Sequence, residues 1–313
     1  MKILITGAAG FIGSSLSAQL LKLGNQVIGV DNYLTGRRST IDQLARSSNF
    51  RFIEQDVIEP LEIEEELDWV MHFASPASPP KYLQYPLETL RVNSEGTMHL
   101  LKLANRKGAS FFFASTSEIY GDPLVVPQSE KYWGNVNCYG PRSCYDEAKR
   151  YAEAMIYAMN KKYKIPIRVI RIFNTYGPNM DLADGRVVTN FMKQIIDKTP
   201  ITVYGDGSQT RCFQYIDDLI SGILKLMDTD YQLPVNFGNQ DEFRIIDLVQ
   251  LFSDIEGRDL EIKFMPLPED DPKRRKPDIS IARTVLDWEP QVRIKEGLIR
   301  TLNYYRFNQE QKE

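Results

Sequence analysis

Cysteine and histidine are both scarce in this chain of 313 residues, which contains three cysteines and two histidines. Cys138, Cys144 and Cys212 are odd in number and lack Cys-x-x-Cys or Cys/His metal spacing, so we expect free thiols and no metal site. His72 falls in a predicted buried strand and His99 in an amphipathic helix, where packing or local hydrogen bonding is the more frequent role. The sequence therefore disfavours metal-dependent and histidine-dependent mechanisms.

Long apolar runs and an excess of basic charge are also missing. No apolar stretch approaches the length that crosses a membrane, and the opening Met-Lys-Ile-Leu-Ile-Thr-Gly is interrupted too early for a signal peptide, so we expect a cytoplasmic protein. The formal net charge is -4 without a long Lys/Arg run, which argues against nucleic acid as a partner. The composition, 42% hydrophobic and 26% charged, is typical of an ordinary globular chain.

Alternating strands and helices predict an α/β fold, namely a Rossmann doubly wound parallel sheet with right-handed crossovers. The rhythm changes near residue 178. We therefore expect a nucleotide-binding domain at 1–178 and a smaller, discontinuous C-terminal substrate-binding domain at 179–313, with part of 212–240 returning to the first. A helix is expected at about 90–107, and irregular structure in the Pro-rich stretch 74–80. Strands of the large sheet are expected at 2–6, 27–30, 50–54, 69–73, 110–114 and 167–172.

The first strand runs into the glycine turn Gly7-Ala8-Ala9-Gly10-Phe11-Ile12-Gly13 and then into a helix. Glycines here allow the backbone to approach a pyrophosphate closely, and the helix N-terminus offers N–H donors. Asp31 follows at the end of the next strand, where a carboxylate accepts from an adenosine ribose hydroxyl and repels a 2'-phosphate. We therefore expect NAD in preference to NADP, although Arg37 and Arg38 lie nearby. Asp56 either contacts the adenine or is a solvated loop acid.

Polar side chains cluster at the end of the fifth strand, Ser115-Thr116-Ser117-Glu118, and on a later helix that carries Tyr145 and Lys149. Ligands of parallel sheets gather at the carboxyl ends of the strands. A Tyr and a Lys four residues apart share a helix face, where the cation and a positive nicotinamide can turn a phenol of pKa about 10 into a usable base. Taken alone, the strand end is as compatible with a turn cap as with a site, and a Tyr/Lys pair at this spacing is more often a surface contact. Their order along the chain favours one shared site.

Together, the glycine turn, Asp31, Thr116, Tyr145 and Lys149 resemble an extended short-chain dehydrogenase/reductase of the NAD-dependent epimerase/dehydratase family, acting on nucleotide sugars, over essentially the whole chain. One position departs from the family pattern, because Asn179 follows Gly-Pro where an Arg is common. Six separated blocks resemble the UDP-glucuronate decarboxylases, or UDP-xylose synthases, of that family: DN with TGR (31–37), HFASPASPP (72–80), STSEIYGDP (115–123), GPRSCYDE (140–147), DGRVV (184–188) and DDPKRRKPD (270–278).

The resemblance implies conversion of UDP-glucuronate to UDP-xylose. In that family NAD+ takes a hydride from C4 of the sugar while Tyr145, aided by Thr116, removes the hydroxyl proton. The resulting β-keto acid loses CO2, C5 is protonated, and NADH returns the hydride. Glu118 is implied to act on C5, directly or through water, and Arg275 to hold the carboxylate, with the route of protonation open. The implied catalytic residues are Thr116, Ser117, Glu118, Tyr145, Lys149 and Arg275.

The same resemblance implies NAD as cofactor, a UDP-sugar as substrate, and a homodimer formed through the helices near 90–107 and 144–162. Cofactor contacts are implied at Gly7, Gly10, Phe11, Ile12, Gly13, Asp31, Asn32, Thr35, Gly36, Asp56, Val57, Phe73, Ala74, Ser75, Asn93, Tyr145 and Lys149. Substrate contacts are implied at Pro79, Arg91, Asn174, Arg186, Tyr204, Gln209, Arg211 and Arg275.

Three other functions compete with decarboxylation. A nucleotide-sugar 4,6-dehydratase typically carries Asp-Glu after the Thr, whereas Ser117 takes the place of that Asp here. A 4-epimerase usually has small neutral residues where Glu118 lies. A non-catalytic, NAD-sensing binding protein is expected to lose Thr116, Tyr145 or Lys149, and this chain retains all three.

Overall fold

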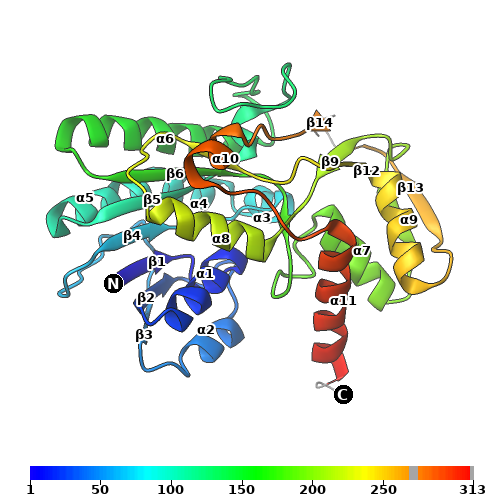
Figure 1. Cartoon of the computed structure of the whole chain (residues 1–313), viewed down its shortest axis with the longest axis horizontal. Coiled ribbons are helices and arrows are strands. Elements are labelled where there is room, and N and C mark those ends of the chain that lie inside the picture. Colours follow the sequence, from blue (N-terminus) through cyan, green and yellow to red (C-terminus); the bar gives the residue numbers. More distant parts are fainter. Residues whose placement is uncertain (268–273, 311–313) are drawn as a thin grey trace.

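Figure 1 shows the computed structural model of the chain, which describes residues 1–267 and 274–310. A parallel sheet of seven strands lies at its centre, in the order β11-β6-β5-β4-β1-β2-β3. The order reverses between β1 and β4, the place where such sheets bind nucleotides at their carboxyl edge. The strands are β1 (Lys2–Thr6), β2 (Gln26–Asp31), β3 (Phe50–Glu54), β4 (Trp69–His72), β5 (Ser110–Thr116), β6 (Ile167–Ile172) and β11 (Val235–Phe237).

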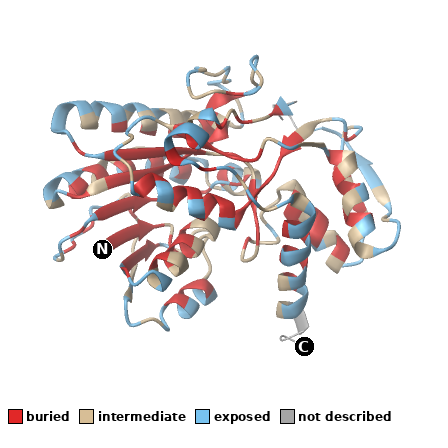
Figure 2. Ribbon diagram, viewed as in Figure 1, coloured by how far each residue is buried: buried red, intermediate tan, exposed pale blue. Residues whose placement is uncertain are grey.

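Helices cover both faces of this sheet, which explains why its central strands are apolar without alternation. In β5, Phe112 belongs to the buried cluster that contains Leu16 and Leu219, whereas Phe111 and Phe113 belong to the cluster on the opposite face. Figure 2 shows the sheet and the inward sides of the helices as buried. The covering helices are α1 (Phe11–Lys22) and α8 (Ile216–Met227) on the first face, and α4 (Pro86–Arg91), α5 (Thr97–Lys107) and α6 (Ser143–Tyr163) on the second.

The single helix expected at 90–107 is divided in the structure by a π turn at Val92–Gly96, between α4 and α5. The side chain of Asn93 donates hydrogen bonds to the Thr89 carbonyl (2.8 Å) and to the Ser75 hydroxyl (2.9 Å). The first bond competes with the regular backbone bonds of a helix, which favours the wider turn. The second ties the turn to the loop that follows β4.

Three short helices are absent from the prediction. α3 (Pro79–Gln84) begins inside the Pro-rich stretch 74–80, because proline is tolerated in the first turn of a helix, where its missing N–H needs no partner. α2 (Arg38–Leu44) and α10 (Ser280–Leu286) have seven residues each. Segments of this length show too few repeats for periodicity to identify them.

The C-terminal part extends the fold beyond the large sheet (Figure 1). α8 packs on the large sheet and β11 is its edge strand beside β6, while the domain boundary at 178 stays a prediction. The short 3-10 helix η2 (Ser117–Tyr120) follows β5. The small sheets pair β10 (Gln214–Tyr215) with β7 (Thr175–Tyr176), β9 (Thr210–Cys212) with β12 (Glu242–Arg244) and β14 (Arg274–Arg275), and β8 (Ile201–Tyr204) with β13 (Ile262–Met265). The remaining helices are α7 (Val187–Ile196), α9 (Ile245–Glu256) and α11 (Ile294–Glu310).

The residues that are scarce in the sequence have structural roles. His72 is buried, with Nδ1 2.8 Å from the Thr6 hydroxyl and Nε2 3.3 Å from the Val92 carbonyl, so its expected local hydrogen bonding is confirmed. Cys138, Cys144 and Cys212 are free thiols. Within 1–267 and 274–310, no helix has both the length and the apolar character needed to cross a membrane, and no group of three or more His, Cys, Asp or Glu is arranged to hold a metal.

Candidate active site

A cavity of about 580 Å³ lies at the carboxyl ends of β1, β4 and β5, between the large sheet and the small sheets of the C-terminal part. It brings together residues predicted for cofactor, catalysis and substrate. The predicted site residues that line it are Gly7, Gly10, Phe11, Ile12, Gly13, Thr35, Phe73, Ser75, Pro79, Thr116, Ser117, Glu118, Tyr145, Lys149, Asn174, Arg186, Tyr204, Gln209, Arg211 and Arg275.

Other predicted cofactor residues do not line the cavity. Asn32 donates a hydrogen bond to Asp56 (Nδ2 to Oδ2, 2.8 Å), and Asn93 holds Ser75 as described above. Such contacts fix the loops that follow β2 and β4. The predicted cofactor residues outside the lining are Asp31, Asn32, Gly36, Asp56, Val57, Ala74 and Asn93.

Arg91 requires a correction, because the structure does not place it at the cavity. Its guanidinium is on an exposed side of α4 and pairs with Glu95, one turn further on (Nε to Oε1 3.0 Å, Nη2 to Oε2 2.9 Å). A pair of this kind at i, i+4 is a solvated surface contact of small energetic value. We therefore remove Arg91 from the predicted substrate contacts.

The glycine turn leaves room that side chains would fill. A Cβ at Gly7, where φ is +72°, would lie 2.7 Å from the Phe73 carbonyl carbon, and a Cβ at Gly13 would lie 2.2 Å from the Gly7 oxygen. The Ala9 N–H donates to Asp31 Oδ2 (2.9 Å), and α1 begins without a side-chain cap on its first N–H groups. The turn therefore fits the pyrophosphate of NAD, which needs close backbone approach and free helix N–H donors.

Arg37 and Arg38, the two arginines that could bind the 2'-phosphate of NADP, are both hydrogen-bonded to protein groups. Arg38 forms a bidentate pair with Glu54 (3.0 and 2.8 Å), and Arg37 Nη2 donates to Asn179 Oδ1 (2.6 Å) and to its carbonyl. Asn179 has φ +70°, a conformation that Asn tolerates better than most residues. It also accepts from the Tyr304 hydroxyl (3.3 Å). The residue that departs from the family pattern thus joins the loop after β2 to α11.

Tyr145 and Lys149 lie one turn apart on α6, as predicted, and both are buried. Lys149 Nζ donates to the Ala114 carbonyl of β5 (2.9 Å), and the ring of Tyr82 stacks on Tyr145 with centroids 5.1 Å apart. Burial raises the pKa of Tyr145 to about 12, against a hydrogen bond with Thr116 that lowers it, and burial lowers the pKa of Lys149 to about 7. Lys149 alone therefore does not make Tyr145 a base near neutral pH, and the part of the sequence argument that includes the positive nicotinamide stays a prediction.

We expect Lys149→Met to raise the melting temperature of the protein below about pH 7, and to raise it less at about pH 10. Burial lowers the pKa of Lys149 from 10.5 to about 7, so between these values the unfolded chain binds this proton and the native protein does not. The free energy of unfolding of the native protein therefore rises with pH across this window. The destabilisation caused by burying the Lys149 ammonium, which Met removes, is greatest at low pH.

The control for this prediction is Lys161→Met, which removes an exposed lysine from the same helix. Its effect on the melting temperature should be small and similar at both pH values. If Lys149→Met also shifts the melting temperature equally at both, burial does not destabilise the Lys149 ammonium.

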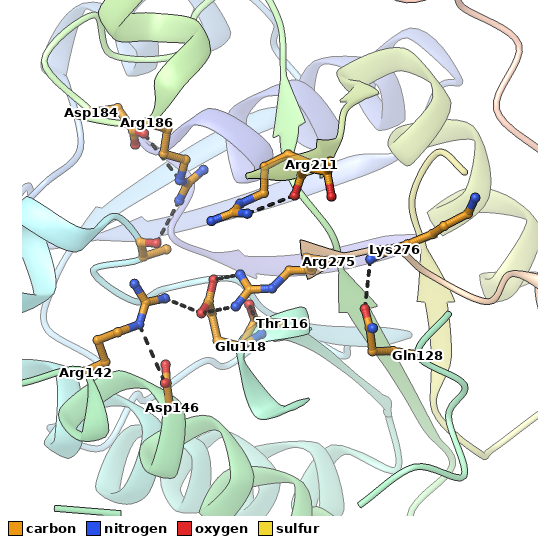
Figure 3. Close-up of polar contacts among 12 residues, drawn as sticks. Thr116, Glu118, Gln128, Arg142, Asp146, Asp184, Arg186, Arg211, Arg275 and Lys276 are labelled. Carbon is orange, nitrogen blue, oxygen red and sulfur yellow. Dashed lines mark hydrogen bonds and ion pairs between the residues drawn. The ribbon is translucent and has the colours of Figure 1, made fainter. Parts of the chain in front are cut away.

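Glu118 is the centre of a largely buried ion-pair cluster (Figure 3). Arg275 holds it through both terminal nitrogens (Nη2 to Oε2, 2.9 Å), and Arg142 Nη2 also donates to Oε2. Burial disfavours the carboxylate, yet the two guanidinium groups outweigh it and lower the pKa of Glu118. Arg142 Nε lies 3.9 Å from Asp146, whose pKa burial and the Glu118 charge raise.

Arg142 and Asp146 are site residues that the sequence argument misses. They flank Tyr145 at three residues before it and one after it, inside the block GPRSCYDE. Tyr82, on α3, is missed as well, although the block HFASPASPP leads directly into that helix. The signal that could have identified Arg142 and Asp146 is that two opposite charges lie close to Tyr145 in the sequence, with no role assigned to either.

Cationic side chains also reach the cavity from the C-terminal part of the chain. Arg186, just before α7, donates to the Ala77 carbonyl (2.7 Å) and lies 3.3 Å from Asp184, and Arg211 projects from β9 (Figure 3). Gln209 donates to the Tyr204 carbonyl (2.9 Å), so these two neighbours are fixed relative to each other. Guanidinium groups that share a cavity with polar side chains suit a diphosphate ligand.

Known proteins resemble the chain along nearly its whole length. The model of the NAD dependent epimerase/dehydratase family matches residues 3–237. UDP-glucuronic acid decarboxylase 1 of Xenopus tropicalis is 50% identical over 305 residues, which cover 97% of this chain and 72% of the relative. The protein of the same name from Arabidopsis thaliana is 47% identical over 306 residues, covering 98% and 70%.

Solved structures confirm the predicted fold class. UDP-glucose 4-epimerase from Thermotoga maritima, solved with UDP-glucose, has a TM-score of 0.89 and 29% identity, covering 99% of this chain and all of its own. UDP-glucuronic acid 4-epimerase from Bacillus cereus, solved with UDP-glucuronic acid and NAD, has a TM-score of 0.88 and 29% identity, covering 98% of this chain. The chain therefore belongs to the NAD dependent epimerase/dehydratase family, in the group that contains the UDP-glucuronic acid decarboxylases.

Proposed function

We propose that this protein uses NAD to decarboxylate UDP-glucuronate to UDP-xylose through a 4-keto intermediate, and that the Glu118 cluster beside Tyr145 carries the steps after oxidation. The cluster is the observation that favours decarboxylation over 4-epimerisation. An epimerase acts at C4 alone and gains nothing from an acid bound by two arginines near C5. The 4,6-dehydratase alternative expects an acid at the place of Ser117, where this chain has a hydroxyl.

Tyr145 takes the C4 hydroxyl proton in the first step, with Thr116 as its hydrogen-bonding partner. NAD+, when bound, accepts the C4 hydride and supplies it again in the last step. The buried Tyr145 needs nearby positive charge to ionise, because burial raises its pKa to about 12. The charge of Arg186 acts in this direction on the pKa of Tyr145, and Lys149, fixed on the Ala114 carbonyl, lies on the same helix face as Tyr145.

The carboxylate of the substrate matches the charge of the Glu118 cluster. Two arginines, Arg142 and Arg275, share the Glu118 carboxylate, and the raised pKa of Asp146 reduces its own negative charge. A second carboxylate therefore enters a site of net positive charge. We propose that Arg275 binds it while Arg142 retains Glu118, which leaves Glu118 ionised next to C5. Arg275 then orients the group that leaves as CO2, because a planar guanidinium suits a bidentate clamp on a carboxylate.

The remaining polar residues bind the nucleotide in this proposal. Arg186 and Arg211, with Asn174, hold the diphosphate, and Tyr204 and Gln209 contact the uracil or ribose. These residues line one continuous cavity with Tyr145 and Glu118, so one UDP-sugar reaches both ends of the site.

The proposed function is tested by incubating the protein with UDP-glucuronate and NAD. We expect release of CO2 and formation of a UDP-pentose, with no net consumption of NAD because the hydride returns to the product. The Tyr145→Phe variant serves as the matched blank. Formation of UDP-galacturonate without CO2 would indicate a 4-epimerase, and turnover of a nucleotide hexose with loss of water would indicate a dehydratase.

We also propose a homodimer formed through α4, α5 and α6, and a cytoplasmic location. Exposed apolar side chains support the dimer, among them Leu87 on α4 (68% exposed) and Tyr157 on α6 (62% exposed). Light scattering of the purified protein should give the mass of two chains, and Leu87→Glu should reduce it. A single-chain mass for the native protein contradicts this proposal.

A further inference from the structure

Gln128 is completely buried in the segment between η2 and α6, and it does not line the cavity. It nevertheless holds the strand-like stretch that follows Arg275. Its N–H donates to the Lys276 carbonyl (2.8 Å), its side-chain Oε1 accepts from the Lys276 N–H (2.9 Å), and its carbonyl accepts from the Asp278 N–H (2.8 Å). Figure 3 shows the contact between Gln128 and Lys276 immediately beyond Arg275.

Every polar atom of Gln128 is used. Besides these three bonds, Nε2 donates to the Val125 carbonyl (2.8 Å), and the Gln128 carbonyl also accepts from Asn236 Nδ2 (3.0 Å). Asn236 is fixed in turn by the Tyr120 hydroxyl, which donates to its Oδ1 (2.8 Å). A buried amide with this many partners has one defined position, and losing one partner leaves unsatisfied groups behind.

Arg275 is therefore attached on two sides. In β14, Arg275 pairs with Arg211 of β9, and its neighbour Lys276 is held by Gln128. The guanidinium then reaches Glu118, which is separated from Gln128 by ten residues of the same segment (128 minus 118). One short piece of chain thus carries the acid and also holds the backbone of the arginine that pairs with it.

We propose that Gln128 is a positioning residue that holds the backbone of Arg275 so that its guanidinium lies at the Glu118 end of the cavity, where it serves the decarboxylation step. The inference rests on the proposed function, which assigns the steps after oxidation to these two residues. Tyr145 and Thr116 are positioned by α6 and β5 and have no bond to Gln128. Loss of Gln128 therefore affects the release of CO2 more than the oxidation at C4.

The test compares the native protein with Gln128→Met, which keeps the length of the side chain and removes its hydrogen bonds to Lys276 and Val125. Oxidation at C4 is followed by the absorbance of reduced cofactor, and decarboxylation by CO2. We expect kcat for CO2 release to fall on the order of tenfold to a hundredfold, the scale on which small misplacements act. The KM for UDP-glucuronate should change little, and reduced cofactor should accumulate during turnover, because its formation outpaces its use.

Two further variants separate positioning from general damage. In Gln128→Glu, burial favours a protonated carboxyl, which supplies an acceptor for Lys276 and a donor for Val125, so this variant should recover much of the CO2 release. Asn160→Ala removes a side-chain bond to the Ile165 carbonyl (2.9 Å) at the far end of α6 and should leave the ratio of CO2 release to oxidation unchanged.

The positioning role is wrong if Gln128→Met slows C4 oxidation as much as CO2 release, or changes neither. If this variant does not fold, the pH profile of Gln128→Glu decides. Its CO2 release relative to oxidation should fall as the carboxyl ionises, and a profile parallel to that of the native protein contradicts the role. Absence of CO2 release from the native protein itself overturns the proposed function instead, so the two failures are distinguishable.

Discussion

Replacing Tyr145 by Phe should lower the rate of UDP-xylose formation by at least roughly a hundredfold while NAD remains bound, because only the proton-transferring hydroxyl is lost. The Phe ring keeps the stacking on Tyr82 and the burial that fix this side chain. What disappears is the hydroxyl and its hydrogen bond with Thr116. Steady-state rates measure the first effect, and the NAD recovered from denatured protein measures the second.

A matched control is Tyr151→Phe. Tyr151 is an exposed tyrosine on the same helix (54% exposed), so removing its hydroxyl should leave the rate unchanged. A near-normal rate for Tyr145→Phe would remove this residue from the mechanism. Loss of NAD from the variant would instead point to a role in binding.

Glu118→Gln should slow CO2 release by about a hundredfold while C4 oxidation changes much less, so that reduced cofactor accumulates. The amide keeps the shape of the side chain but leaves Arg142 and Arg275 without their shared negative charge in a buried place. Breaking a buried pair in this way costs about 3–5 kcal/mol, so the melting temperature should fall as well.

Glu147→Gln is the control for this change. The Glu147 carboxylate is a partly exposed partner of Arg150 on α6 (Oε1 to Nε, 3.5 Å), and its loss should affect neither step. Absorbance of reduced cofactor and trapped CO2 report on the two steps separately. If C4 oxidation fails as severely as CO2 release, Glu118 does not act at C5.

Local spacing explains which parts of the site the sequence predicts. The glycine turn, Asp31, and Tyr145 with Lys149 are each defined within one strand, turn or helix, so residue spacing alone fixes their geometry. The large sheet is also predictable from the order of apolar segments. Its central strands are buried on both faces, so each one is a continuous apolar run that is easy to recognise in the sequence. These elements are found where they are expected.

Contacts between distant segments explain the rest. Arg142 is 24 residues from Glu118 in sequence and Arg275 is 157 residues away, so no local pattern shows that both hold one carboxylate. Charge spacing likewise suggests that Lys149 lowers the pKa of Tyr145, whereas burial, which only tertiary structure reveals, raises it. Arg91 is misassigned because the face of α4 that turns to solvent is set by packing.

The π turn at Val92–Gly96 makes the length of this segment as important as its composition. An α-helix rotates about 100° per residue, so one residue deleted here would turn all of α5 by that angle relative to α4. Leu100 and Leu101, now buried against the sheet, would then face a different direction, and Asn93 would no longer reach Ser75. Insertions and deletions are therefore tolerated far less at this turn than ordinary substitutions on its exposed side.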